Sequence, residues 1–440
     1  MHFTSTCIIL AITVFNGLLA GAAPINRQKG ILTFPIRSLH RRSGDLSDPL
    51  YFKRTINRAY HRAGKLTGRQ NGASVVGRDY PMGPRDTETH AASRIMRKRA
   101  LQVANAPDAP NSLGLDIDGS DSGYIATIQI GTPPRDFNIL MDSGSSDLWV
   151  GSEICSGQKG GNCGQHTFLG LNSSSTFVNT TDAWNITYGT GFAAGFKVQD
   201  NIAIAGMSLN NHTFGIAQVE SSDFTGADFD GLMGLAQSGL SNQGVPTPVE
   251  SLALQGLISE AIVSYKISRG ADKLNDGEIS FGGLDSSKFD SSTLTTLPNL
   301  SPIGFWEAAM DGASVDGKDA GFNNRTAILD TGTSLAFGPR NDVIALHKLI
   351  TGAAFDGQTF TVPCSLNQSV ALSFGGRTFT IDPRDIAFAQ ANNNDVCVSG
   401  IQTGAVDDNG STWLVGDTFL KNAYYSTDVN RNTISLAKLI

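Results

Sequence analysis

The chain has 440 residues, with 33 Lys and Arg against 40 Asp and Glu, and a formal net charge of −7. Residues 23–99 hold 17 basic and 5 acidic side chains, whereas residues 100–440 hold 16 basic and 35 acidic ones. A basic segment alone would suggest nucleic acid or an acidic membrane as its partner. Here the acidic remainder of the same chain is the better partner, so we expect no nucleic-acid ligand.

The N-terminus has the pattern of a secretory signal. Residues 7–19 are mostly apolar, and the small residues Ala20-Gly21-Ala22 follow them, although no Lys or Arg comes before. The apolar run is too short to span a bilayer. We therefore expect residues 1–22 to be a signal peptide and the protein to be secreted, with the vacuole as an alternative destination. The competing interpretation is a buried apolar strand.

The basic segment, residues 23–99, is interpreted as a propeptide. Its attraction to the acidic residues 100–440 would hold it over the active part of the protein while the carboxylates are ionised. This attraction weakens as the carboxylates are protonated. Residues 97–99, Arg-Lys-Arg before Ala100, are typical of a dibasic processing site. A solvated basic tail is the alternative. The remaining residues suffice for two lobes of roughly 170 residues, each with a core.

Two segments 188 residues apart are close copies of one another. Residues 139–146 read Ile-Leu-Met-Asp-Ser-Gly-Ser-Ser, and residues 327–334 read Ala-Ile-Leu-Asp-Thr-Gly-Thr-Ser. An aspartate at the end of an apolar strand is costly unless its charge is needed. The repetition predicts that Asp142 and Asp330 are brought together for one task. A third triplet, Asp-Ser-Gly at residues 121–123, follows no apolar strand and is typical of a turn.

An apolar pair followed by glycine also recurs after each acid. Residues 232–234 are Leu-Met-Gly and begin 90 residues after Asp142; residues 414–416 are Leu-Val-Gly and begin 84 residues after Asp330. Such duplication implies two lobes related by an approximate twofold axis, each giving one acid to a cleft between them. Short alternating runs cut by Gly, Asn and Ser predict an all-β fold with few helices.

These motifs resemble the pepsin-like aspartic proteases, in particular the secreted fungal members. The resemblance runs from about Gly123 to the C-terminus, and it also rests on residues 124–134, 148–150, 186–191, 229–235 and 414–417. It implies the bilobal pepsin-like fold. We expect an N-terminal lobe over residues 100–290, a C-terminal lobe over residues 291–440, and the active-site cleft between them.

The expected chemistry is hydrolysis of peptide bonds at acid pH, without a cofactor or a covalent intermediate. Two neighbouring carboxylates cannot both stay charged, so they share one proton. The charged partner takes a proton from water, and the protonated partner donates to the scissile carbonyl. The resemblance implies that neighbours of the two acids orient them: Ser143, Gly144, Ser145, Thr331, Gly332 and Thr333. Ser143 stands where most relatives have threonine, so we expect looser packing and retained activity.

Tyr188 lies beside glycines that suit a mobile hairpin tip. The resemblance makes this hairpin the flap over bound peptide, with Tyr188, Gly189 and Thr190 in it and Tyr188 hydrogen bonded toward Trp149. An ordinary exposed hairpin is the alternative. The same resemblance assigns Leu140, Phe224 and Leu232 to the pocket before the cut bond, which predicts cleavage next to large hydrophobic residues. Fungal relatives that accept lysine carry aspartate where this chain has Thr190.

Four cysteines remain after the signal, and three pairings are possible. Proximity and the family pattern imply Cys155–Cys163 and Cys364–Cys397. The spacings suit no zinc site, and we expect no metal. His166, His212 and His347 are expected in surface or loop positions. Glycosylation is expected at some of eight Asn-x-Ser/Thr sequons: Asn172, Asn179, Asn185, Asn211, Asn299, Asn324, Asn367 and Asn409.

Rival functions fit the sequence less well. A cell-surface protease that cuts at basic pairs usually carries a hydrophobic C-terminal anchor signal, and residues 435–440 show none. A catalytically dead homologue typically loses an acid, the flap tyrosine or a flanking glycine, and all are present. A serine hydrolase is disfavoured because no Gly-x-Ser-x-Gly elbow occurs. The expected protein is a monomeric zymogen with polypeptide substrates, its own propeptide as inhibitor, and no membrane anchor.

Overall fold

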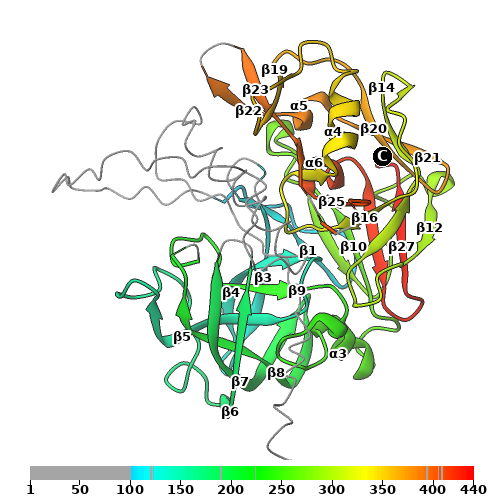
Figure 1. Cartoon of the computed structure of the whole chain (residues 1–440). Coiled ribbons are helices and arrows are strands. Elements are labelled where there is room, and N and C mark those ends of the chain that lie inside the picture. Colours follow the sequence, from blue (N-terminus) through cyan, green and yellow to red (C-terminus); the bar gives the residue numbers. More distant parts are fainter. Residues whose placement is uncertain are drawn as a thin grey trace, which may run out of the picture. The chain divides into compact units, whose positions relative to one another are not determined.

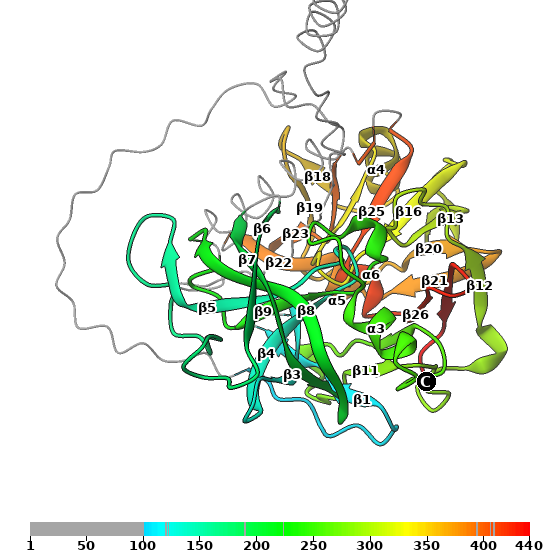
Figure 2. The same cartoon turned by 90° about the horizontal axis from the view of Figure 1, so that it is seen from below.

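The computed structural model describes residues 101–118, 121, 123–188, 191–222, 224–392, 395–404, 406–407 and 410–440. The expected signal peptide and propeptide, the flap residues Gly189 and Thr190, and the sequon at Asn409 lie outside these residues. Within the described residues, strands dominate and helices are short, which confirms the all-β fold (Figures 1 and 2).

An eight-stranded sheet carries the first acid. Its strands, in spatial order, are β2 (Asp116–Asp118), β3 (Gly123–Ile130), β4 (Arg135–Asp142), β9 (Gly231–Gly234), β5 (Leu148–Gly157), β8 (Met207–Glu220), β7 (Phe192–Ile204) and β6 (Val178–Thr187). Only Thr127 and Gln129 of β3 are exposed, in alternation with buried neighbours. This period of two buries one face of the strand fully. Asp142 is the last residue of β4.

A five-stranded sheet leads to the second acid. Its order is β13 (Glu307–Met310), β16 (Arg325–Leu329), β25 (Thr412–Val415), β17 (Ala336–Gly338) and β24 (Ile401–Thr403). It repeats the order β3-β4-β9-β5-β8 with the same pairing directions. In the first sheet, β4–β9 is parallel, β9–β5 antiparallel and β5–β8 parallel. In the second, β16–β25 is parallel, β25–β17 antiparallel and β17–β24 parallel. The internal duplication is therefore a property of the fold.

Glycine is required where the second strand of each repeat meets the acid-bearing loop. A Cβ on Gly234 would collide with the backbone of Ser146 and Asp147, and one on Gly416 would collide with the carbonyl of Thr333. In return, Leu235 N donates to the Asp142 carbonyl at 2.6 Å, and Asp330 N donates to the Val415 carbonyl at 3.0 Å. The two apolar-pair-glycine motifs thus pack against the acid-bearing loops.

A six-stranded sheet joins distant parts of the chain: β1 (Ser112–Gly114), β11 (Glu278–Phe281), β10 (Ile262–Lys266), β26 (Tyr424–Asp428), β27 (Thr433–Ala437) and β12 (Thr295–Pro298). Two four-stranded sheets complete the strands: β15 (Lys318–Asp319), β14 (Gly312–Val315), β20 (Val370–Phe374) and β21 (Arg377–Ile381); and β18 (Ala354–Phe355), β19 (Phe360–Pro363), β23 (Val396–Ser399) and β22 (Ala387–Asn392).

The helices are α3 (Pro248–Leu254), α4 (Arg340–His347), α5 (Pro383–Ile386) and α6 (Asp417–Leu420). Helix α3 begins where local chemistry favours it: the Thr247 hydroxyl accepts from Glu250 N at 3.2 Å, the Glu250 carboxylate accepts from Thr247 N, and Pro248 occupies the first turn. None of the described helices is long and apolar enough to cross a membrane.

One minor expectation was wrong. His212 and His347 are buried rather than at the surface. The two ring nitrogens of His347 are hydrogen bonded to the Val343 carbonyl and the Ser399 hydroxyl, at 2.8 and 2.9 Å. Burial lowers the pKa of both histidines to about 4, so each stays neutral inside the sheet region at neutral pH.

Candidate active site

Asp142 is buried, and its own loop satisfies both carboxyl oxygens. The Gly144 amide donates to Oδ1 at 2.7 Å, and the Ser145 hydroxyl donates to Oδ2. Both donors come from the turn that follows β4, because the chain reverses there and directs its first free N–H groups back at the acid. These bonds fix the orientation of the carboxyl.

Asp330 follows β16 and repeats the arrangement. Gly332 N donates to Oδ1 at 2.8 Å, and Thr333 Oγ1 donates to Oδ2 at 2.6 Å. The side chain is also fully buried. A Cβ on Gly144 would overlap the Asp330 carboxylate, so the two acid-bearing turns are in direct contact. The structure therefore brings together the two acids that the repeated motif singled out.

The residues after the two acids hold the turns together by reciprocal hydrogen bonds, which we call the hydroxyl clasp of Ser143 and Thr331. Ser143 N donates to Thr331 Oγ1, and Thr331 N donates to Ser143 Oγ, both at 2.9 Å. Each hydroxyl then donates across to the opposite strand, Ser143 to the Leu329 carbonyl at 3.0 Å and Thr331 to the Met141 carbonyl at 2.9 Å. The serine thus makes the same kinds of hydrogen bond as its threonine counterpart.

Burial and proximity set the electrostatics of the pair. Burial raises the pKa of the Asp142 carboxyl well above its usual value, and the charge of Asp330 raises it further. The hydrogen bonds from Ser145 and Gly144 oppose this rise, and a hydrogen bond with Asp330 adds to it. A pair of this kind holds one proton over a wide pH range. It can therefore act as base and acid at once.

Tyr188 lies in an aromatic and aliphatic cluster above β4 and β9. Trp149 Nε1 donates to the Tyr188 hydroxyl at 2.6 Å, as the resemblance implied. The Phe224 ring packs edge-on against both, with centroids 5.1 Å from Trp149 and 5.3 Å from Tyr188. Leu140 and Leu232 belong to the same buried cluster. The structure thus brings together all five described residues that were expected in the flap and the pocket.

Sequence reasoning missed Asp417. Its backbone N–H donates to the Thr333 carbonyl at 2.7 Å, next to the hydroxyl that orients Asp330. Its carboxyl is 1% exposed and has no hydrogen-bond partner among the described residues. Burial raises its pKa well above the usual value, Lys421 opposes the rise, and the charge of Asp330 adds to it. The acid directly after the residue 414–416 motif was the available signal.

Asp147 was also missed. It is fully buried five residues after Asp142, and it accepts hydrogen bonds from the Ser241 hydroxyl at 2.6 Å and from Asn242 N at 2.9 Å. These bonds tie the acid-bearing turn to the segment before α3. Asp121, the first residue of the third triplet, lies in a turn, as expected; it accepts from Gly270 N at 2.7 Å and pairs with Lys421 at 3.1 Å.

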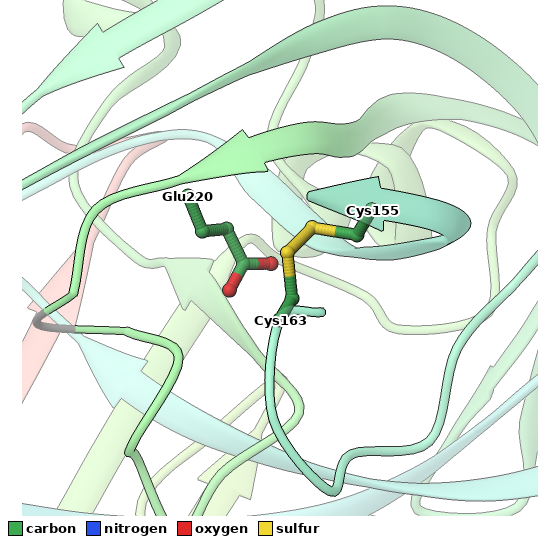
Figure 3. Close-up of side chains that lie close together, drawn as sticks. All are labelled: Cys155, Cys163 and Glu220. Carbon is green, nitrogen blue, oxygen red and sulfur yellow. A yellow bond between two sulfur atoms is a disulfide. The ribbon is translucent and has the colours of Figure 1, made fainter. Parts of the chain in front are cut away.

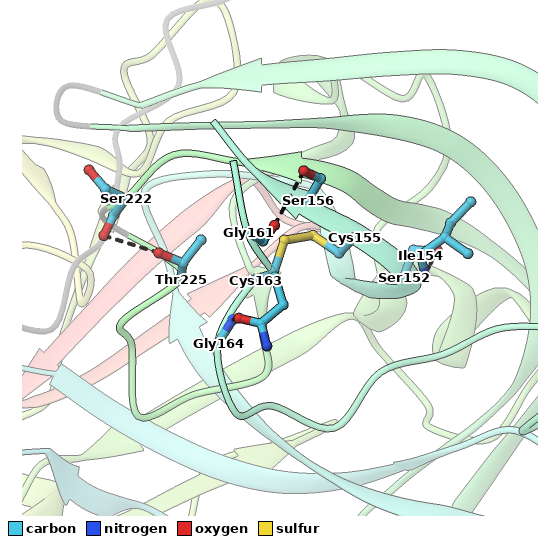
Figure 4. Close-up of a disulfide and its surroundings, with 10 residues drawn as sticks. Ser152, Ile154, Cys155, Ser156, Gly161, Cys163, Gly164, Ser222 and Thr225 are labelled. Carbon is cyan, nitrogen blue, oxygen red and sulfur yellow. Dashed lines mark hydrogen bonds between the residues drawn. A yellow bond between two sulfur atoms is a disulfide. The ribbon is translucent and has the colours of Figure 1, made fainter. Parts of the chain in front are cut away.

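Both expected disulfides are present, Cys155–Cys163 and Cys364–Cys397. The first closes a short loop after β5, which a hydrogen bond from Ser156 Oγ to the Gly161 carbonyl at 3.3 Å also closes (Figure 4). The Glu220 carboxyl lies beside this disulfide (Figure 3). These three residues are the one cluster of potential metal ligands among the described residues. Both sulfur atoms are already used in the covalent bond.

Two buried aspartates, each oriented by a glycine amide and a hydroxyl, meet across a twofold repeat and form a candidate two-carboxylate active site. A model of the family described as eukaryotic aspartyl protease matches residues 123–439. The chain belongs to this family.

Curated relatives agree with this assignment. The chain is 35% identical over 337 residues to a probable aspartic-type endopeptidase CTSD of Arthroderma benhamiae, covering 76% of this chain and 65% of that protein. It is 34% identical to the aspartic-type endopeptidase ctsD of Aspergillus fumigatus, covering 77% and 70%. Rhizopuspepsin of Rhizopus chinensis is 35% identical, covering 70% and 76%. The match thus spans about two thirds of the Arthroderma relative's length.

Proposed function

We propose that this protein is an aspartic endopeptidase that hydrolyses polypeptides at acid pH. The hydroxyl clasp is the observation that carries the proposal, because it holds the loops of Asp142 and Asp330 together with the same hydrogen-bonding pattern on both sides. In the working state one acid is ionised and the other protonated. The ionised acid takes a proton from water, the water oxygen attacks the scissile carbonyl, and the protonated acid donates to the carbonyl oxygen. A tetrahedral diol results, and its collapse releases the two peptides.

The test compares the wild-type protein with isosteric variants. Asp142→Asn and Asp330→Asn keep the shape of the site but remove the shared proton, so haemoglobin cleavage at acid pH should fall by at least about a thousandfold. A statine-type transition-state analogue should inhibit the wild type. Asp121→Asn is the matched control: it changes the first residue of the third triplet, whose side chain bonds Gly270 N and Lys421 and takes no part in the clasp, and should retain cleavage. Full activity of Asp142→Asn would exclude the mechanism.

We further propose that the protein is a secreted zymogen. The distribution of charge supports this, since residues 23–99 are strongly basic and residues 100–440 strongly acidic. The chain secreted by a eukaryotic host should begin near Ala100, after the Arg-Lys-Arg site. N-terminal sequencing with and without Asp142→Asn separates the routes: processing that persists in the variant is due to a convertase, and processing that stops is autocatalytic. A secreted, fully active chain that still begins near residue 23 would contradict inhibition by the propeptide.

The proposed specificity is for large hydrophobic residues around the cut bond. It rests on the cluster of Leu140, Phe224 and Leu232 around Tyr188, all apolar and buried. A charged lysine in such surroundings would lose its hydration without gaining a partner. Digestion of denatured proteins at acid pH should yield cuts beside Leu, Phe and similar residues. A digest dominated by cuts after lysine would contradict this assignment.

A further inference from the structure

Strand β6 is the open edge of the eight-stranded sheet. Among the described residues it pairs only with β7, so its outer N–H and C=O groups meet no other strand. Exposed edges of this kind are templates for pairing with another chain, and proteins usually blunt them with charge, proline or bulges. The question is what blunts this one.

The first half of β6 carries such devices. Its register is interrupted between Asn179 and Ala183, and Thr181 has a positive φ of 65°. Asp182 forms an ion pair with Lys197 at 3.2 Å. The second half, residues 183–187, pairs regularly with β7 and reads Ala-Trp-Asn-Ile-Thr, without charge, glycine or proline. Tryptophan, isoleucine and threonine favour strands. This half of β6 is therefore the part of the edge that could pair with a strand of another chain.

Asn185 sits in the middle of that unprotected half, within the sequon Asn185-Ile186-Thr187. Its side chain is exposed, whereas Trp184 and Ile186 are buried, so it points away from the cluster that holds Tyr188. Its side-chain amide forms no hydrogen bond with any of the described residues. Tyr188 lies three positions further along the chain, about 10 Å away in an extended strand.

The sequon at Asn179 also lies on β6, in the interrupted first half of the strand, and three of the other sequons differ from Asn185 in ways that matter. Asn299 is 8% exposed, and its Nδ2 donates to Asn432 at 2.9 Å, so a sugar there is incompatible with the fold. Asn172 Nδ2 is held by Glu153 at 3.0 Å. Asn367 is exposed and unbonded like Asn185 but lies between β19 and β20, on no sheet edge. It supplies a matched comparison.

We propose that Asn185 carries an N-linked oligosaccharide that covers the open edge of β6 and leaves the Tyr188 face free. The proposal rests on the proposed passage through the secretory pathway. In the transfer, Asn185 Nδ2 attacks the anomeric carbon of a lipid-diphosphate-linked oligosaccharide. The new N–C bond forms as the sugar C–O bond to the diphosphate breaks; Nδ2 gives one proton to a base of the transferase, and the lipid diphosphate leaves.

Occupancy is tested first, on the protein secreted by a eukaryotic host. Enzymatic release of N-glycans converts each occupied asparagine to aspartate, which peptide mass spectrometry detects. We expect conversion at Asn185 and none at Asn299. An unmodified Asn185 beside a modified Asn367 would overturn the inference and leave secretion intact. No conversion at any sequon would contradict both the inference and the secretory part of the proposed function, while the Asp142→Asn assay stays independent.

The protective role is tested by self-association at acid pH. Asn185→Gln should raise the aggregated fraction about threefold or more, because the edge is uncovered, while the rate on a short peptide stays within about twofold of the wild type. Asn367→Gln removes a sugar but should not promote association. If Asn185→Gln is not secreted, Thr187→Val and enzymatic deglycosylation of the folded protein serve instead. Equal association of all glycoforms would refute the role.

Discussion

Ser143 and Thr331 occupy equivalent positions in the two repeats and together make four hydrogen bonds, two with each other and one each to the opposite strand. The Ser143→Ala variant would leave Thr331 N without a partner in a buried site, at a cost of about 1–3 kcal/mol in unfolding free energy, while the Leu329 carbonyl would still accept from the Tyr425 hydroxyl at 3.2 Å. Activity should fall as the acids lose their alignment. Ser143→Thr retains the hydroxyl and should keep both properties. Urea unfolding and haemoglobin cleavage of the two variants measure the difference, and equal loss in both would point to crowding instead.

Glu220 has a carboxyl with no hydrogen-bond partner among the described residues, and burial raises its pKa from 4.5 to about 8. Between these values the unfolded chain has released the proton and the folded chain retains it, so stability falls as pH rises through this window. Glu220→Gln removes the ionisation. The variant should match the wild type near pH 4 and exceed it near pH 7.5 by at least about 1.4 kcal/mol.

Glu153→Gln is the control for that measurement. Glu153 lies on the same strand, β5, as Cys155, and hydrogen bonds from Ser173 and Asn172 lower its pKa although partial burial opposes them. Its ionisation therefore favours the folded state, and its removal should not stabilise the protein near pH 7.5. Denaturant curves at both pH values decide the matter. A gain for Glu220→Gln of the same size at both pH values would show that packing, not ionisation, causes it.

At the scale of elements, the two disulfides close loops of unequal length, with separations of 8 and 33 residues. The entropy removed from the unfolded chain grows with loop length, which gives about 2.5 kcal/mol for the shorter loop and about 3.7 kcal/mol for the longer one. Replacing Cys364 and Cys397 by alanine should therefore cost more stability than replacing Cys155 and Cys163. Calorimetry of the two double variants checks the order, and a larger loss at the short loop would indicate that local packing dominates.

The sequence predicted those elements whose signal is local. The short alternating strands and the duplicated acid motifs were predicted, because strand period and turns depend on near neighbours. The pairing of β10 with β26 could not be predicted in this way. It joins residues 262–266 to residues 424–428, and no local sequence pattern encodes a partner that distant. Glu220 and Asp417 were missed for a related reason: burial of an acid is decided by what packs over it.

Across the molecule, residues 100–440 carry 35 acidic side chains against 16 basic ones. Self-repulsion of this charge weakens in acid, so the melting temperature should be highest at acid pH and decline above neutrality. Salt near 1 M has a Debye length of about 3 Å. It should restore the part of the melting temperature that surface charge repulsion removes above neutral pH. It should leave the difference between wild type and Glu220→Gln in place, because a buried carboxyl is not screened. Scanning fluorimetry with and without salt tests this, and a difference that salt abolishes would place the effect at the surface.

The hydroxyl clasp is unchanged when the two repeats exchange places: each donor finds an acceptor of the same kind on the other side. A single repeat carries one acid and one clasp hydroxyl, and its clasp donors and acceptors have no partners within that repeat. A second copy of the same repeat would supply all of those partners in an isologous contact. The proposed catalytic centre thus has, within one chain, the hydrogen-bonding pattern of a homodimer interface. Once the two halves are covalently joined, each is free to change on its own, which is how serine on one side can face threonine on the other.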